Sequence, residues 1–175
     1  LISDIIEERQ ALFEREEIGS YKEYLKLHSL PLIALVIDNF GAFIELYSDF
    51  EEKMIKLMHD SVRYGIQIIA TVNNTSEIKY KMRSYVLDSI VLRMNEKSEY
   101  SEFFGRTPEF LPTPVNGRGL MTTGGSIIEY QAALPARGAN ESIRSEMLKK
   151  EFGDICAQYT GSVSAKKIPI ISKDT

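Results

Sequence analysis

An acidic residue ends one apolar stretch of the chain. Residues 32–37 are uniformly apolar, and Asp38 and Asn39 follow them directly. At the carboxyl end of a buried parallel strand, a carboxylate can hold a hydrated Mg²⁺ ion beside nucleotide phosphates. Asp38 therefore either coordinates such an ion through water or begins an ordinary loop. The apolar stretch alone does not decide between these roles.

A second apolar stretch, residues 66–72, contains Thr71 near its end and is followed by Asn73. A hydroxyl and an amide at this height could hydrogen-bond a γ-phosphate or the water that attacks it. Ordinary loop hydrogen bonding explains both side chains equally well. Many ATPases with an acidic residue at the end of such a strand carry a second carboxylate directly after it, and Asn39 stands at that position. An amide cannot act as a base at neutral pH. If this edge is a nucleotide site of that kind, we expect poor hydrolysis, with metal and nucleotide binding retained.

Three arginines are weaker candidates. Arg63 falls in the last turn of a predicted helix, where a cation is favoured by the helix dipole. Arg106 and Arg118 stand in loops beside glycines, so each is either a surface side chain or an arginine finger toward a neighbouring subunit. His28 and His59 are isolated and have no metal-ligand spacing.

One motif is misleading. Residues 119–126 have the glycine spacing of a phosphate-binding loop, but Gly125 stands where that loop needs a lysine. The segment also precedes a strand-like stretch, so a helix N-terminus is missing. We predict a hairpin turn at Gly124 and Gly125.

The elements that must position the candidate residues form a strand–helix–strand unit. Residues 32–37 lack the alternation of a half-exposed strand, which predicts a strand buried on both faces. Helix 49–64 follows, and Gly65 is placed to end it before strand 66–72. Such a unit indicates an α/β fold with a parallel sheet.

The remaining sequence predicts further elements in order. The expected segments are a helix capped by Ser3 through Glu17, a helical piece 21–27, a helical piece 77–86, a strand 89–94, a helix 98–104, strands 119–122 and 127–134, and a helix capped by Asn140. The last helix should bury a stripe formed by Ile143, Met147, Ile155, Cys156 and Tyr159. Residues 168–171 suggest an edge strand or the start of a linker.

Composition sets bounds on function. Of the 175 residues 26% are charged, and the net charge of −4 gives no basic footprint for nucleic acid. Cys156 is the only cysteine, so no intrachain disulfide is possible, and a reducing compartment is favoured. No stretch is long and apolar enough to span a bilayer. The chain begins without Met inside a predicted helix, and we expect it to be part of a longer protein.

The order of motifs resembles the C-terminal part of an FtsK/SpoIIIE-type ATPase domain. The matching segments are the acidic helix 6–13, Tyr24, the Walker-B-like stretch 30–38, Arg63-Tyr64-Gly65-Ile66, Ile69-Ala70-Thr71 and Gly117-Arg118-Gly119-Leu120-Met121. Three departures stand out: Asn39 replaces a Glu, Asn73-Asn74 replace Gln-Arg-Pro, and Leu120 replaces an Asp. Such degeneracy is similar to the last ATPase module of EssC/YukB-type proteins, the membrane-anchored motors of type VII secretion.

This resemblance implies a RecA-like P-loop NTPase fold, with a predominantly parallel sheet flanked by helices and the P-loop segment missing from the chain. Residues 1–160 would be a partial ATPase domain, and 161–175 a tail or linker. ATP and Mg²⁺ would be the cofactors of the complete domain. Asp38 would hold the metal, Thr71, Asn73 and Arg118 would join it in nucleotide binding, and Asn39 would mark a weakened catalytic position.

The implied partners are secreted helical-hairpin proteins, other ATPase modules of the same chain and copies in a homo-hexamer, at the cytoplasmic face of the membrane. Two alternatives stay open. One is an FtsK-type DNA translocase. The negative net charge and the Asn at position 39 argue against it. The other is a substrate-docking module that needs no nucleotide.

Overall fold

A computed structural model describes residues 1–159 of the chain. The chain divides into two compact units, Leu1–Tyr130 and Gln131–Thr175. The first unit contains the predicted strand–helix–strand segment together with a second sheet. Within residues 1–159 no helix is long and apolar enough to cross a membrane.

The elements follow one another closely along the chain. The helices are α1 (Ile2–Arg15), α2 (Tyr21–Tyr24), α3 (Phe40–Leu46), α4 (Glu51–Asp60), α5 (Tyr80–Arg83), α6 (Ser101–Phe104) and α7 (Glu141–Gln158). The 3₁₀ turns are η1 (Ser48–Phe50), η2 (Ser61–Tyr64), η3 (Thr75–Glu77) and η4 (Lys97–Tyr100). The strands are β1 (Ile33–Ile37), β2 (Ile66–Ala70), β3 (Ile90–Leu92), β4 (Arg118–Thr123) and β5 (Ser126–Gln131).

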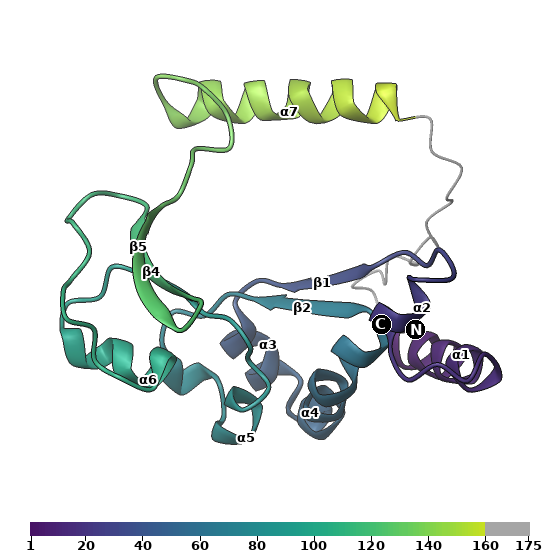
Figure 1. Ribbon diagram of the computed structural model, residues 1–175. Helices are drawn as coiled ribbons and strands as arrows, with labels where there is room; N and C mark the ends of the chain where they lie inside the picture. The colour runs from purple at the N-terminus through teal and green to yellow at the C-terminus, as the bar shows by residue number, and fades with distance from the viewer. Residues whose placement is uncertain (160–175) are drawn as a thin grey trace. The chain divides into compact units, whose positions relative to one another are not determined.

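The predicted strand–helix–strand unit is confirmed. Strands β1 and β2 are parallel, with Ile33 opposite Ile66 and Ile37 opposite Ala70. Helices α3 and α4 lie on one side of this sheet (Figure 1). The predicted helix 49–64 is α4 with a 3₁₀ turn at each end. It stops at Gly65, whose left-handed backbone (φ 71°) ends the helix as expected.

A core forms between the sheet and the helices on that side. Phe40 and Ile44 of α3 pack with Met54 of α4 and Met82 of α5, and Ile37 joins them from β1. The side chains of β1 alternate between half-buried and exposed, and Val36 is 64% exposed. The prediction that this strand is buried on both faces is therefore wrong. Within residues 1–130, the helices that pack against this sheet, α3 and α4, lie on one face of it.

The amino end of the same sheet is closed by a buried arginine. Arg9 of α1 is only 5% exposed. Its Nη1 donates to the carbonyl oxygens of Tyr64 (2.5 Å) and Gly65 (3.1 Å), and its Nη2 donates to that of Pro31 (2.7 Å). Burial lowers the pKa of this guanidinium. The rings of Phe13 and Tyr64, 5.7 Å apart, pack beside it in a second small core.

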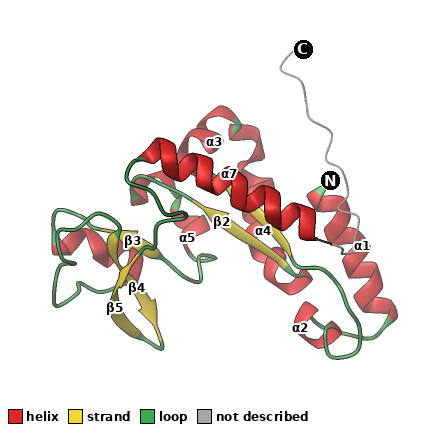
Figure 2. Cartoon of the chain, turned by 90° about the horizontal axis from the view of Figure 1, so that it is seen from above, coloured by secondary structure: helices red, strands yellow, loops and turns green. Residues whose placement is uncertain are grey.

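The other strands form a separate three-stranded sheet in the order β3–β4–β5 (Figure 2). Strand β3 runs antiparallel to β4, with Val91 opposite Leu120. The sequence prediction of one predominantly parallel sheet is wrong for this part of the chain. Val91 is buried while Ile90 and Leu92 are exposed, and this alternation is typical of a half-covered antiparallel strand.

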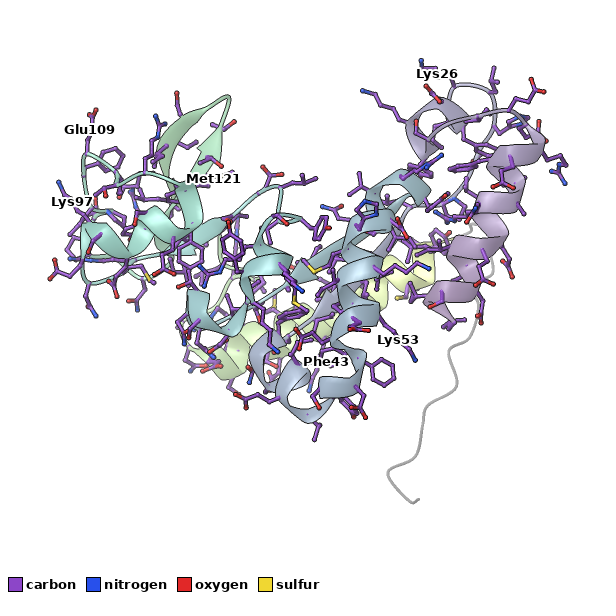
Figure 3. The ribbon with its side chains drawn as sticks, turned by 90° about the horizontal axis from the view of Figure 1, so that it is seen from below. Lys26, Phe43, Lys53, Lys97, Glu109 and Met121 are labelled. Atoms are coloured by element: carbon purple, nitrogen blue, oxygen red, sulfur yellow. The ribbon has the colours of Figure 1, made fainter. Side chains whose placement is uncertain are left out.

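The predicted hairpin at Gly124 and Gly125 is confirmed, since β4 and β5 flank these residues. Gly119 of β4 is required by close packing: a Cβ there would come within 2.2 Å of the Val91 carbonyl oxygen. The hydroxyl of the buried Tyr100 accepts a hydrogen bond from the Met94 amide (2.8 Å). Lys97 donates to the Glu109 carbonyl oxygen and ties η4 to the following loop (Figure 3).

The second unit contains α7, and the predicted cap is present. Asn140 Oδ1 accepts from the amide of Ile143 at 3.0 Å. The predicted buried stripe is wrong, because no residue of this helix is buried. Cys156, expected as inert core, is exposed. The sequence spacing did produce a helix, but the described residues of this unit provide no layer that covers it.

Two other predictions concern the ends of the chain. Ser3 does not cap the first helix, because α1 already begins at Ile2 and Leu1 occupies the cap position. The predicted strand or linker at 168–171 lies outside the described residues. The predicted boundary between 160 and 161 also falls there and stays a prediction.

Candidate functional site

The candidate site forms where β1 and β2 end. Hydrogen bonding between the two segments continues beyond the strands: the Thr71 amide donates to the Ile37 carbonyl oxygen (3.0 Å), and the Phe40 amide donates to that of Thr71 (2.9 Å). Because parallel strands end at the same edge of a sheet, this pairing holds Asp38 beside Thr71. The sequence prediction that these two residues share one edge is confirmed.

Thr71 joins both residues that follow β1. Its hydroxyl donates to Asp38 Oδ1 at 2.5 Å and accepts a hydrogen bond from the Asn39 amide at 2.9 Å. All three residues are exposed to solvent. The single hydrogen of this hydroxyl is thus used in holding the carboxylate.

Asn39 has a structural role that its type explains. Its backbone is left-handed (φ 55°, ψ 61°), and its Oδ1 caps α3 by accepting from the Ala42 amide at 3.4 Å. Asparagine tolerates this conformation better than most residues, and it is a good helix cap. Local backbone geometry therefore accounts for an amide at this position. The sequence could not reveal this, because the backbone angles of a residue cannot be read from its type.

Asn73 lies just beyond β2 and is held by a residue that the sequence reasoning missed. Its backbone amide donates to Glu77 Oε2 at 2.9 Å, and its side-chain Nδ2 donates to Oε1 at 3.3 Å. The only sequence signal was the spacing of the asparagines from a following glutamate, which is typical of a local loop bond. Asn73 is thus near the predicted position, with its amide already engaged.

The donor set suits Mg²⁺ only as part of a larger site. Asp38 Oδ2 accepts no hydrogen bond from the residues described, so one carboxylate oxygen faces solvent. Residues 1–159 contain no group of three or more acidic, histidine or cysteine side chains that could hold a metal on its own. Magnesium commonly binds through one or two carboxylates, several waters and substrate phosphates. Asp38 fits that pattern.

Arg118 belongs to the other sheet. It begins β4, and its Nη1 lies 3.3 Å from Glu129 Oε2 on β5. The amide of Thr113 donates to Glu129 at 2.6 Å, and this bond, assisted by Arg118, lowers the pKa of the Glu129 carboxyl. Arg118 also lines an open groove of about 340 Å³ together with Arg93. Nucleotide binding by Arg118 remains a prediction.

The other candidates have local partners. Arg63 Nε donates to the Gly19 carbonyl oxygen (3.0 Å), and Arg106 Nη2 donates to that of Gly125 (2.7 Å). His59 Nδ1 lies 2.6 Å from Asp60 Oδ1 and His28 Nε2 lies 3.7 Å from Glu16 Oε2. Each of these side chains thus has a partner other than Asp38 or Thr71. None of the four bonds involves the candidate site at the edge of the parallel sheet.

Comparison with known proteins places this geometry in context. No protein-family model matches the chain. The ESX secretion system protein EccC of Geobacillus thermodenitrificans is 29% identical over 168 residues, which cover 95% of this chain. The type VII secretion system protein EssC of Staphylococcus aureus is 26% identical over 174 residues. The chain spans 11% and 12% of these two proteins, about a tenth of their length.

Solved structures agree. The chain is similar to EssC (ATPases 2 and 3) from Geobacillus thermodenitrificans, with a TM-score of 0.84, 28% identity, and coverage of 98% of this chain and 33% of the other. It also shares the fold of Thermomonospora curvata EccC (ATPases 2 and 3), which was solved with a signal sequence peptide. Here the TM-score is 0.75 and the identity 21%, with 96% of this chain and 32% of the other covered.

Three observations point to the same group of proteins. They are the motif order, the edge shared by Asp38 and Thr71, and the similarity in sequence and structure. The resemblance predicted from the sequence is confirmed: the chain is similar in sequence to EssC, EccC and YukB proteins of type VII secretion, and its fold matches solved ATPase domains of EssC and EccC.

Proposed function

We propose that this chain contributes the metal-binding edge of a degenerate ATP-binding module in a type VII secretion motor. The observation that carries the proposal is the hydrogen bond from Thr71 to Asp38 across two parallel strand ends. This edge is where ligands bind in open α/β sheets. The similarity to the solved ATPases 2 and 3 of EssC supports the proposal, and we expect the complete module to have a RecA-like core.

Each candidate residue then has a distinct role. Asp38 holds Mg²⁺ through water, and Thr71 orients its carboxylate toward the ion. Asn73 approaches the γ-phosphate from the neighbouring loop, and Arg118 adds positive charge from β4. Asn39 supplies no base, so hydrolysis is weak even where nucleotide is bound. Phosphoryl transfer depends mostly on positioning and charge, and binding can outlast the loss of a base.

The partners follow from the relatives. One structural neighbour was solved with a signal sequence peptide and carries two ATPase modules. By analogy, this chain works beside other modules of a longer protein and helps recruit or move small helical secreted proteins. Its place would be the cytoplasmic face of the membrane, with a homo-hexamer as the assembly.

Nucleotide binding by the full-length gene product that contains this chain tests the proposal. Calorimetry with Mg·ATP should show binding by the wild type and at least about tenfold weaker binding by Asp38→Ala, because the charged ligand of the ion is lost. Asp49→Ala, which removes an exposed carboxylate from η1, is the matched control. Unchanged affinity in Asp38→Ala would remove this edge from the site.

The 175-residue chain by itself gives a second test. It contains no phosphate-binding loop, since Gly125 occupies the lysine position of its only similar motif. We therefore expect no measurable ATP binding by this chain alone. Micromolar binding by calorimetry would contradict the assignment of Asp38 to an incomplete site.

A further inference from the structure

Glu77 is the carboxylate that the sequence reasoning overlooked. It ends η3 and accepts hydrogen bonds from three nitrogen atoms: the Asn73 amide (2.9 Å), Asn73 Nδ2 (3.3 Å) and Asn74 Nδ2 (3.1 Å). These bonds fold the segment after β2 back on itself. The Glu77 side chain therefore holds the turn that carries Asn73, together with Asn74, whose Oδ1 accepts from the Ser76 amide at 3.0 Å.

The same side chain contacts the segment that follows β1. A Cβ atom placed on Gly41 would lie 2.7 Å from Glu77 Cγ and 2.9 Å from Cδ. Gly41 is buried in the first turn of α3, two residues after Asn39. Glu77 thus rests on the start of α3 while it holds the turn after β2. It joins the two segments that form the edge of the candidate site.

We propose that Glu77 is a positioning residue of this site: it fixes Asn73 and seats the turn after β2 against α3. The inference rests on the function proposed above. Glu77 is half-buried and its two carboxylate oxygens already accept three hydrogen bonds. These three bonds within the turn leave few lone pairs of this carboxylate for a water molecule. Glu77 therefore does not replace the base that is absent at Asn39.

The arrangement also limits what Asn73 offers to a ligand. One hydrogen of its Nδ2 is used by Glu77, so Oδ1 and the second hydrogen remain. Loss of the Glu77 charge would free the side chain to rotate. The position of Asn73 relative to Asp38 would then no longer be fixed, and a phosphate contact would lose its geometry.

Two variants separate charge from shape. Glu77→Gln keeps the size but replaces one accepting oxygen with an NH₂ group, whereas Gly41→Ala leaves the carboxylate and pushes it from its seat. Glu45→Gln, on the exposed side of α3, is the matched control. Amide hydrogen exchange on the 175-residue chain should be about tenfold faster at Asn73 in Glu77→Gln, since a bond to a charged acceptor is lost. Protection in the core of β2 should be unchanged.

Mg·ATP binding by the full-length gene product completes the test. Glu77→Gln and Gly41→Ala should each weaken binding at least about threefold, and Glu45→Gln should not. Unchanged hydrogen exchange at the Asn73 amide would show that Glu77 does not hold the turn after β2. Faster exchange with unchanged binding, in a protein where Asp38→Ala abolishes binding, would overturn only the positioning role. A wild-type protein that binds no nucleotide would overturn both the positioning role and the proposed function.

Discussion

The two ends of the β1–β2 sheet are built in opposite ways. At the amino end a buried arginine donates to three carbonyl oxygens, those of Pro31, Tyr64 and Gly65. At the carboxyl end Asp38 and Thr71 bond each other in full contact with solvent. Both ends therefore satisfy their polar groups, but only the second leaves a charged oxygen available to a ligand.

The amino end of this sheet therefore contributes mainly to the stability of the fold, and the carboxyl end is available for ligand binding. Buried hydrogen bonds are costly to lose, because the groups that remain cannot turn to water. Exposed hydrogen bonds cost little free energy to break, because water replaces them. Residues that make them can therefore bind a ligand with little effect on folding. We expect the free energy of unfolding to depend steeply on the amino end and weakly on the carboxyl end.

The largest effect should come from Arg9. Arg9→Met keeps much of the apolar stem but takes the arginine donor from the carbonyl oxygens of Pro31 and Tyr64, while that of Gly65 still accepts from the Ile33 amide. We expect a loss of about 3 kcal/mol in the free energy of unfolding, measured by urea denaturation of the 175-residue chain. Arg15→Met, at the exposed end of α1, should cost less than about 0.5 kcal/mol. Equal effects of the two changes would remove the contrast between the ends.

Asn39 should give the next largest effect. Asn39→Ala removes the helix cap and places alanine in a left-handed backbone, for an expected cost of about 2 kcal/mol. Asn39→Gly loses the cap but accepts that backbone and should cost less than about 1 kcal/mol. Thermal or urea unfolding distinguishes the two. If alanine and glycine were equally tolerated, the left-handed turn would not explain this residue.

Thr71 should affect stability less than either. Thr71→Val removes the hydroxyl that donates to Asp38 and accepts from the Asn39 amide. Because these groups are exposed, water can replace the lost bonds, and we expect a cost of about 0.5–1 kcal/mol. A loss as large as that of Arg9→Met would show that the carboxyl end is also structural.

The smallest effect should come from Glu129 in the β3–β4–β5 sheet, and it concerns how the free energy of unfolding depends on pH. The pKa of Glu129 is held below its usual value of 4.5, first by the Thr113 amide and also by Arg118. Because the folded pKa is lowered, its contribution to stability is present above that value and is lost as pH falls through the folded pKa. As the pH falls below 4.5, the free energy of unfolding of Glu129→Gln should therefore depend less on pH than that of wild type.

An exposed glutamate in the same sheet region provides the control for this prediction. Glu109 lies in the loop after α6, and only its backbone carbonyl oxygen accepts a bond, from Lys97. Glu109→Gln removes a carboxyl group without touching the contacts of Thr113 and Arg118, and its unfolding is measured over the same pH range. If both variants behaved alike, the Thr113 and Arg118 contacts would not be the cause of the Glu129 shift.

The sequence could predict what depends on local pattern. Apolar residues 32–37 and 66–72, with a helix between them, predict two parallel strands, and that alone puts Asp38 beside Thr71. The glycine pair in the hairpin and the Asn140 cap are equally local. In each case the signal and the structure involve the same few residues.

What the sequence missed depends on packing between distant segments. Strand β1 reads as buried on both faces because its residues are apolar, yet the exposure of Val36 is set by which elements cover the sheet. Asn39 reads as a missing base because its backbone angles are invisible in a sequence. Glu77 matters through its contact with Gly41, 36 residues earlier in the chain (77 − 41).

A double-mutant cycle between Asp38 and Thr71 tests the central claim most directly. Mg·ATP affinity would be measured for the full-length gene product as wild type, Asp38→Ala, Thr71→Val and the double variant. If Thr71 acts by orienting Asp38, the double variant should bind no more weakly than Asp38→Ala alone. Losses that add, or an affinity that neither change affects, would contradict a metal–nucleotide site at this edge.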